Sequence, residues 1–199
     1  MADMSFPKVA FNAVVWVLLI WILLPLAAIV IVSFEADHLL TKGFEGLTFK
    51  WYRAAWDVAS FQSGLRVSLI VAVVSTLIAG VVGVAAAIGL ARWTSRWRST
   101  VDTVLLLPVL VPGLIVGIGL LQATALVGVE AGYGRLIAAH ALVITPYIIR
   151  TTYACLVVQG SSLEEAGRTM GASERRVLFE ITLPLTLPGI IAGMLFAFI

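Results

Sequence analysis

The feature that most constrains this chain is a series of long apolar runs, which cover about residues 11–33, 65–91, 101–127, 136–158 and 185–199. A helix needs about 20 apolar residues to cross the hydrocarbon core of a bilayer. In lipid every backbone N–H and C=O group must find a partner within the protein, and an α-helix achieves this by itself. The sequence therefore predicts an all-α polytopic membrane protein, with five spans in a single transmembrane domain over residues 1–199.

Composition excludes several other classes of protein. Hydrophobic residues make up 61% of the 199 residues and charged residues only 12%, whereas about 25% of a typical soluble domain is charged. The net charge of +2 is too small to indicate nucleic acid as a partner. The single cysteine, Cys155, excludes a disulfide framework and a cysteine-based metal site. Membrane lipid is therefore the expected surrounding of most of the chain.

Both ends of the sequence bear on the number of spans. The first apolar run is longer than the hydrophobic region of a secretory signal and lacks a small-x-small cleavage site, so we expect a retained span. As a helix, residues 185–199 would rise only about 22 Å, less than the hydrocarbon core of about 30 Å. We therefore expect the sequence to be truncated at its C-terminal end, inside a span.

The positions of the cations predict the orientation of the spans. Arg92, Arg96 and Arg98 lie between the second and third apolar runs, and positively charged loops stay in the cytoplasm. The segment 159–184 also carries arginines and lies two spans later, so it must face the same side. Lys8, before the first run, agrees with this orientation. Both the N-terminus and the segment 159–184 are expected in the cytoplasm.

The stretch 161–184 carries an ordered series of helix signals. Ser162 can cap a helix N-terminus, and Glu165 three residues later can complete a capping box. Gly171 suits the left-handed residue that ends such a helix, and Ser173 can cap a second helix. The pattern predicts two short helices joined by a glycine corner.

The first of these short helices has two expected faces. Leu163, Ala166 and Met170 are spaced to form one apolar face. Glu164 and Arg168, four residues apart, can pair on the outer face. An amphipathic helix between two spans favours a docking element at the cytoplasmic surface.

The same stretch resembles the EAA signature of ABC-importer permeases. The residues at the spacing of this signature are Glu165, Ala166, Gly171, Ile181, Leu183 and Pro184. One departure is Gly167, where the family more often has alanine; glycine lowers the stability of a helix by about 1 kcal/mol or less. The resemblance implies a type I ABC-importer transmembrane-domain fold, in which the loop 159–184 is the coupling helix that sits in a groove of the ATP-hydrolysing subunit.

This resemblance also implies roles and partners. It implies polar or capping contacts for Glu165, the corner for Gly171, and a rigid return into the last span at Leu183 and Pro184. The full set of coupling residues that it implies is Glu165, Ala166, Gly167, Gly171, Ile181, Leu183 and Pro184. The implied partners are a homodimer of ATP-binding subunits, a second permease subunit and an extracytoplasmic solute-binding protein, assembled in a bacterial inner membrane.

Three further stretches resemble the spermidine/putrescine permeases within this family. They are SFE after the first run, LTFKWYRAAW in the loop that follows, and AAHALVITPYIIRTTYA in the fourth run. This similarity implies a polyamine as the solute. Importers of phosphonate, ferric iron and opines share much of these stretches, so those solutes remain alternatives.

Two other classes of membrane protein compete with an importer permease: a secondary carrier that needs no ATPase, and a non-transporting scaffold. Ion-coupled carriers usually need carboxylates inside the membrane, and the cores of the apolar runs contain no Asp or Glu. The sequence has no Gly-x-x-x-x-Gly-Lys-Ser/Thr motif, so ATP hydrolysis must come from a separate subunit. His38 and His140 are far apart, which argues against a catalytic metal. We expect no cofactor and no enzymatic activity of the chain itself.

Several other residues allow two interpretations. Aromatics beside cations in the first loop suit a short helix at the headgroup level, or an aromatic box for a cationic ligand; they are Lys50, Trp51, Tyr52, Arg53 and Trp56. Arg150 could line a pathway, brace the docking loop or extend to the cytoplasmic interface. Prolines are expected to bend their helices, beside a translocation path or as ordinary kinks: Pro108, Pro112 and Pro146.

Small residues spaced four apart predict close packing between helices. The pairs are Gly113 with Gly117, Gly189 with Gly193, and Ala85 with Gly89. In lipid, helices associate through close approach of their backbones at such residues. The partner helix can belong to this chain or to a second permease subunit.

Overall fold

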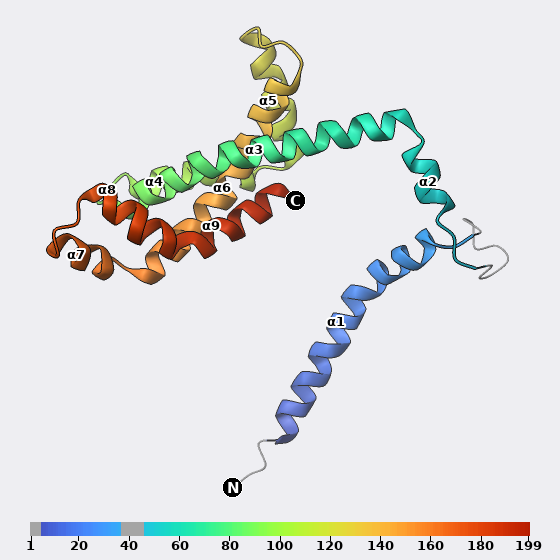
Figure 1. Cartoon of the computed structure of the whole chain (residues 1–199), viewed down its shortest axis with the longest axis horizontal. Helices are drawn as coiled ribbons and strands as arrows, with labels where there is room; N and C mark the ends of the chain where they lie inside the picture. Colours follow the sequence, from blue (N-terminus) through green and yellow to red (C-terminus); the bar gives the residue numbers. More distant parts are fainter. Residues whose placement is uncertain (1–4, 37–45) are drawn as a thin grey trace. The chain divides into compact units, whose positions relative to one another are not determined.

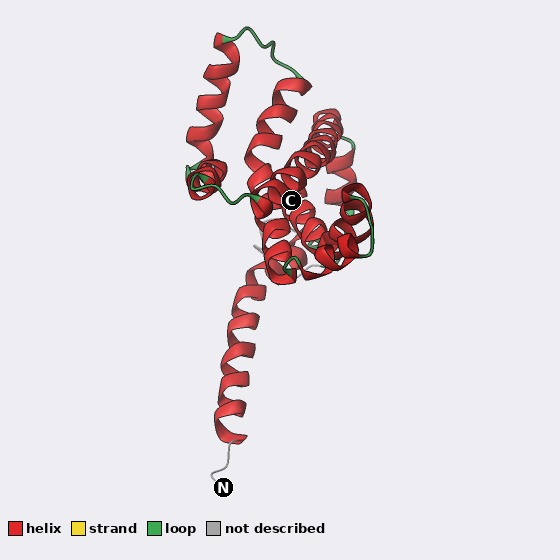
Figure 2. Ribbon diagram, turned by 90° about the vertical axis from the view of Figure 1, so that its left-hand side faces the viewer, coloured by secondary structure: helices red, strands yellow, loops and turns green. Residues whose placement is uncertain are grey.

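The computed structural model describes residues 5–36 and 46–199, and in these ranges the chain is almost entirely helical (Figure 2). The one departure from helices and loops is an isolated antiparallel bridge between Glu35 and Leu47. The all-α class predicted from the sequence is confirmed. The chain divides into two compact units, Met1–Gly64 and Leu65–Ile199.

The first unit contains two helices, α1 (Ser5–Ser33) and α2 (Lys50–Trp56). The indole N–H of Trp51 donates to the carbonyl of Glu35 at 2.9 Å, and the hydroxyls of Ser33 and Tyr52 lie 2.7 Å apart. These bonds connect α2 to the end of α1. The aromatic and basic stretch of the first loop therefore forms a short helix, as its composition predicts. His38 lies outside the described residues.

The second unit contains the remaining helices, and α3 begins just before its boundary. In chain order they are α3 (Ala59–Arg92), α4 (Arg98–Leu110), α5 (Gly113–Leu126), α6 (Tyr133–Gln159), α7 (Ser162–Thr169), α8 (Glu174–Arg176), a π-helical segment η1 (Val177–Thr182) and α9 (Leu183–Phe198). Figure 1 shows α9 alongside α6, with α7 and α8 at the turn between them. The core is small and comes from three helices, through Ala79 of α3, Ile148 of α6 and Ala197 of α9.

Glycines bring α6 and α9 close together. A Cβ atom added at Gly193 would lie 2.8 Å from the Cα of Ile148, and one added at Gly189 would lie 2.7 Å from the carbonyl oxygen of Thr151. By contrast, nothing lies within 4 Å of a Cβ added at Gly113 or at its partner Gly117. The GxxxG pair of α9 therefore packs within the chain, whereas the pair of α5 has open space beside it among residues 5–36 and 46–199.

Four helical segments of the described ranges are long and apolar enough to cross a membrane: Ala10–Ser33, Ala59–Arg92, Tyr133–Gln159 and Glu174–Phe198. The stretch 101–127, expected as one span, consists of α4 and α5, which meet at 101°; together they are long and apolar enough to be a fifth, broken span or a re-entrant loop. The break lies at Pro112, which has no N–H to donate and favours an extended Val111 (ψ 136°). Pro108 and Pro146 remain inside their helices.

The end of the chain also differs from the expected arrangement. We predicted a short second helix and then a separate span from about residue 185, but α8, η1 and α9 follow one another without a loop. Pro184 has no N–H group, so a regular α-helical ladder is interrupted there. The π-helical turn accommodates this interruption, and the N–H of Leu183 bonds to the carbonyl of Leu178 five residues earlier.

Candidate functional site

The candidate site is the corner formed by α7, α8 and η1. Helix α7 begins one residue earlier than predicted, because Ser161 and not Ser162 is its N-cap. The expected capping box is absent, since no cap side chain bonds to a backbone N–H. Instead, the Ser161 hydroxyl donates to the carboxylate of Glu165 at 2.6 Å. Glu165 is exposed and remains available to a partner.

The glycine corner has the geometry that the sequence predicts. Gly171 has φ +87°, in the left-handed region that favours glycine. Its N–H bonds to the carbonyl of Arg168 at 2.9 Å, and the N–H of Ala172 bonds to that of Gly167 at 3.0 Å. This pair of bonds is the Schellman motif, which satisfies the last carbonyls of α7. The next helix then starts with Ser173, whose hydroxyl accepts from the N–H of Arg176 at 3.4 Å.

Gly167 has a packing role that its low helix propensity did not suggest. It is buried where α7 lies against η1, and a Cβ added there would be 2.6 Å from the Cδ1 of Ile181 and 3.6 Å from the Cγ2 of Val177. The glycine therefore permits a close approach of α7 to η1. An alanine at this position would require the flexible end of Ile181 to move.

The structure separates the predicted coupling residues into three groups. Gly167 and Ile181 meet inside the corner, whereas Glu165 and Ala166 are exposed on α7. Gly171 forms the exposed turn. The last two predicted residues, Leu183 and Pro184, lie in the first turn of α9 and continue the helix that begins at Glu174.

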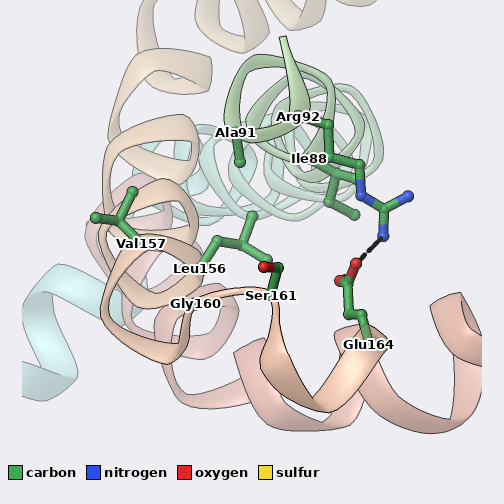
Figure 3. Close-up of a pocket in the computed structure, with 8 residues that line it drawn as sticks. All are labelled: Ile88, Ala91, Arg92, Leu156, Val157, Gly160, Ser161 and Glu164. Carbon is green, nitrogen blue, oxygen red and sulfur yellow. Dashed lines mark hydrogen bonds and ion pairs between the residues drawn. The ribbon is translucent and has the colours of Figure 1, made fainter. Parts of the chain in front are cut away.

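The position of Glu164 differs from the one predicted from the sequence. It pairs with Arg168 at 3.3 Å, as predicted, but its side chain is only 15% exposed and does not lie on an outer face. Its carboxylate accepts hydrogen bonds from Arg92 at 3.0 and 3.1 Å and from the hydroxyl of Thr182 at 2.6 Å. Figure 3 shows the side chains of Arg92 and Glu164 pointing toward each other from α3 and α7.

Charges in the corner support this arrangement. Burial works to raise the pKa of Glu164, but the hydrogen bonds from Thr182, Arg92 and Arg168 and the charge of Arg92 outweigh it, so the pKa lies below its usual value of 4.5. Across the glycine corner, the Arg168 guanidinium donates to Glu174 at 2.6 and 3.1 Å. This fork lowers the pKa of Glu174. The carboxylates therefore stay ionised near neutral pH.

The outward face of α7 is apolar and open. Leu163 is 53% exposed and Met170 is 82% exposed, with Ala166 exposed between them. These residues have the spacing of one helix face. Exposed large apolar side chains on a short helix with a charged interior side are typical of a protein-binding surface.

The remaining candidate residues are located within or beside long helices. Arg150 of α6 pairs with Asp102 of α4 at 3.4 Å, a pairing that none of its three predicted roles included. The Nδ1 of His140 lies 2.8 Å from the carbonyl of Leu136 in its own helix. In residues 5–36 and 46–199, no group of three His, Cys, Asp or Glu side chains is arranged to hold a metal ion.

Comparison with known proteins gives one family and several relatives. The family model described as "Binding-protein-dependent transport system inner membrane component" matches residues 79–199. The spermidine/putrescine transport system permease protein PotC of Escherichia coli (strain K12) is 28% identical over 178 residues, which cover 89% of this chain and 67% of the relative. PotC of Haemophilus influenzae (strain ATCC 51907 / DSM 11121 / KW20 / Rd) is 28% identical over 187 residues, 94% of this chain and 72% of the relative. The molybdenum transport system permease protein ModB of E. coli (strain K12) is 48% identical over 60 residues, 30% of this chain and 26% of the relative.

Proposed function

Because this chain belongs to the family of binding-protein-dependent transport system inner membrane components, we propose that it is the permease subunit of an ATP-driven ABC importer. The chain itself is a multi-pass membrane protein of a transport family. The proposal adds three partners: a pair of ATP-binding subunits that hydrolyse ATP, a second permease subunit, and an extracytoplasmic binding protein that delivers the solute.

The observation that carries this proposal is the construction of the α7 corner. This eight-residue helix presents exposed Leu163, with exposed Met170 directly after its end, while Gly167 is buried against η1 and Glu164 is bonded to Arg92. A rigid amphipathic helix of this kind suits insertion into an apolar groove of a partner protein. We assign the ATP-binding subunit as that partner, with Glu165 as an exposed polar contact.

The continuous helix after the corner suggests how movement passes into the membrane. Segments α8, η1 and α9 form an unbroken helical path from Glu174 to Phe198. A displacement of α7, which packs on η1, therefore reaches the transmembrane end of α9 without passing through a flexible loop. ATP binding drives this displacement only if the docked helix binds the two states of the ATPase with different affinity.

The proposed orientation places the N-terminus and α7 in the cytoplasm of a bacterial inner membrane. The arginines at the end of α3 and in the α7 corner support this orientation through the positive-inside rule. The unpacked glycines of α5, Gly113 and Gly117, support a second permease subunit, because such residues permit close approach of another helix.

A polyamine is the solute that we favour. The support is the similarity to two PotC proteins over 89% and 94% of this chain. Molybdenum is the second candidate, because the ModB relative reaches 48% identity over its shorter match. Uptake of labelled spermidine and of labelled molybdate by cells that express the complete transporter distinguishes these candidates, with each unlabelled compound as competitor.

Co-purification tests the docking proposal directly. An ATP-binding subunit encoded beside this chain is expected to remain bound to the detergent-solubilised chain. Gly171→Val strains the left-handed corner, and Glu165→Arg reverses an exposed charge, so each is expected to lower the retained amount at least severalfold. Glu130→Gln, in the α5–α6 loop, serves as the matched carboxylate control. Uptake that persists after deletion of the ATP-binding subunit would exclude the proposal in favour of a secondary carrier.

A further inference from the structure

We propose that Glu164 is a positioning residue, which fixes the docking helix α7 to the ends of two transmembrane helices, α3 and α9. It does so through Arg92 and Thr182. The meaning of this role in transport rests on the function proposed above, but the attachment itself follows from contacts within the chain. Glu164, Arg92 and Thr182 are called the clamp below.

The clamp joins three separate elements at one carboxylate. Nη2 of Arg92, the last residue of α3, donates to both oxygens of Glu164 and lies 3.4 Å from the hydroxyl of Thr182. The Thr182 hydroxyl, at the end of η1, donates to Oε1 of Glu164 at 2.6 Å. Thr182 is 2% exposed and the Glu164 side chain 15% exposed. Hydrogen bonds to a shielded charge are stronger than those between exposed neutral groups.

Packing does little to connect α3 with α7, so these polar bonds carry the connection. A hollow of about 190 Å³ lies beside the clamp. Its lining comes from the ends of α3 and α6 and the start of α7: Ile88, Ala91, Arg92, Leu156, Val157, Gly160, Ser161 and Glu164 (Figure 3). Among the described residues of α3, Arg92 alone makes hydrogen bonds to α7 or η1.

The clamp also uses the polarity of the helix ends. Arg92 lies in the last turn of α3 and Glu164 in the first turn of α7. A cation is favoured at a helix C-terminus and an anion at an N-terminus, so each side chain suits its own helix as well as its partner. Through Arg168, which contacts both Glu164 and Glu174, the same carboxylate is linked to the helix beyond the glycine corner.

Two adjacent acids of α7 therefore have different tasks. Glu165 is exposed and bonds only within its own turn to Ser161, whereas Glu164 faces inward and bonds to α3 and η1. A displacement of α7 is therefore transmitted through Glu164 to both α3 and α9. Without the clamp, α7 would keep its docking surface but move independently of α3.

Hydrogen exchange of the full chain in lipid nanodiscs tests the attachment. Glu164→Ala and Arg92→Met are each expected to increase the opening of the α7 amides about tenfold. The double variant is expected to show no more than the larger single effect, because both changes remove the same bond.

Conservative variants refine this test. Arg92→Lys, which retains the charge, is expected to restore at least part of the protection of the α7 amides. Glu164→Gln, which can still accept a hydrogen bond from Thr182, is expected to lose less of this protection than Glu164→Ala. Glu180→Gln is the matched control, since this exposed acid has only an exposed ion pair with Arg176.

These measurements can overturn the inference in two ways. Exchange in Glu164→Ala that equals exchange in Glu180→Gln would show that the clamp does not hold α7. Fully additive effects of Arg92→Met and Glu164→Ala would show that the two residues act independently. Should Glu164→Ala not fold, the near-isosteric Glu164→Gln, compared with Arg92→Met and the double variant, carries the same comparison.

A second measurement distinguishes positioning from docking. The chain bound to its ATP-binding subunits is treated with MgATP and orthovanadate, and exchange is compared at α7 and at the ends of α3 and α9. Glu164→Gln is expected to retain the ATP-binding subunit at the wild-type level while losing more than half of the nucleotide-dependent change in α3. Loss of the subunit, or an undiminished change in α3, would overturn the positioning role. If the wild-type chain binds no ATP-binding subunit, the proposed function fails, and the nanodisc result still decides whether the clamp exists.

Discussion

The α6–α9 interface and the contact of α7 with α3 are held together by different physical means. Between α6 and α9, glycines bring the backbones together, so that a Cβ at Gly193 would lie 2.8 Å from the Cα of Ile148. Between α7 and α3, a hollow of about 190 Å³ lies beside an ion pair of Arg92 and Glu164. Close backbone packing therefore holds α6 against α9, whereas an ion pair and its hydrogen bonds hold α7 to α3.

This difference matches the surroundings that the proposed orientation gives the two regions. Helices in lipid gain little from burial of apolar surface and associate through close packing. A connection at the polar end of the bundle can use charged groups, which allow larger movements than interlocked backbones. The α6–α9 interface is thus suited to remain fixed, and the α7 contact to transmit or release movement.

Gly193→Val should have the largest effect and should disrupt only the first contact. Its added atoms would overlap the Oγ1 of Thr151 and meet the backbone of Ile148 at 2.8 Å, and a backbone cannot move aside as a side-chain end can. Overpacking of this kind is expected to lower the free energy of unfolding by about 3 kcal/mol. Reversible unfolding in mixed micelles measures the change.

Gly117→Val is the matched control for this prediction. Among the described residues outside the adjoining turns of α5, nothing lies within 4 Å of a Cβ at Gly117, so the unfolding free energy of the isolated chain should be unchanged. Equal destabilisation by the two substitutions would contradict the assignment of the α9 glycines to packing within the chain and of the α5 glycines to a surface.

Lowering the pH should have a smaller effect, confined to the second contact. The pKa of Glu164 lies below its usual value of 4.5, so its ionised form stabilises the fold. That stabilisation is complete above the usual pKa and disappears as the pH falls below it, through the lowered pKa of the folded protein. Protection factors of the α7 amides should therefore be constant from pH 7 to about pH 5 and should fall below about pH 4.5.

The control for this pH dependence is Glu164→Gln, which cannot titrate. Its α7 protection should be lower at neutral pH and should change less with acidification, and any remaining change reports Glu174, whose pKa is also lowered. Amides at the α6–α9 interface should keep their protection throughout. A parallel loss of protection at both contacts would mean that acid unfolds the whole unit and would remove the distinction between them.

The two regions also differ in how well the sequence predicted them. The glycine spacing of α9, the left-handed Gly171 and the Ser173 cap each depend on residues close together in the chain, and the structure contains all three. Glu164 was predicted only with its local partner Arg168, because its other partners lie 72 and 18 residues away. Local periodicity cannot show such contacts. The break at Pro112 was predicted as a bend, but the local sequence does not determine its angle of 101°.

Gly167→Ala should have the smallest effect. Gly167 lies at a close packing contact between α7 and η1, on the same short helix that the clamp holds by hydrogen bonds. The added methyl group meets the Cδ1 of Ile181 at 2.6 Å, which is the mobile end of a side chain, while the Cγ2 of Val177 at 3.6 Å is at ordinary contact distance. The cost of moving Ile181, about 1 kcal/mol, opposes a gain in helix propensity of about 1 kcal/mol. The free energy of unfolding should therefore change by less than about 1 kcal/mol in either direction.

Gly167→Val is the contrasting variant, because its gain in helix propensity does not offset the cost of packing. Its branched side chain must displace Val177 as well as Ile181, and it should separate α7 from η1. Equal hydrogen exchange of α7 in the Ala and Val variants would show that α7 does not depend on this packing and that the clamp alone holds it.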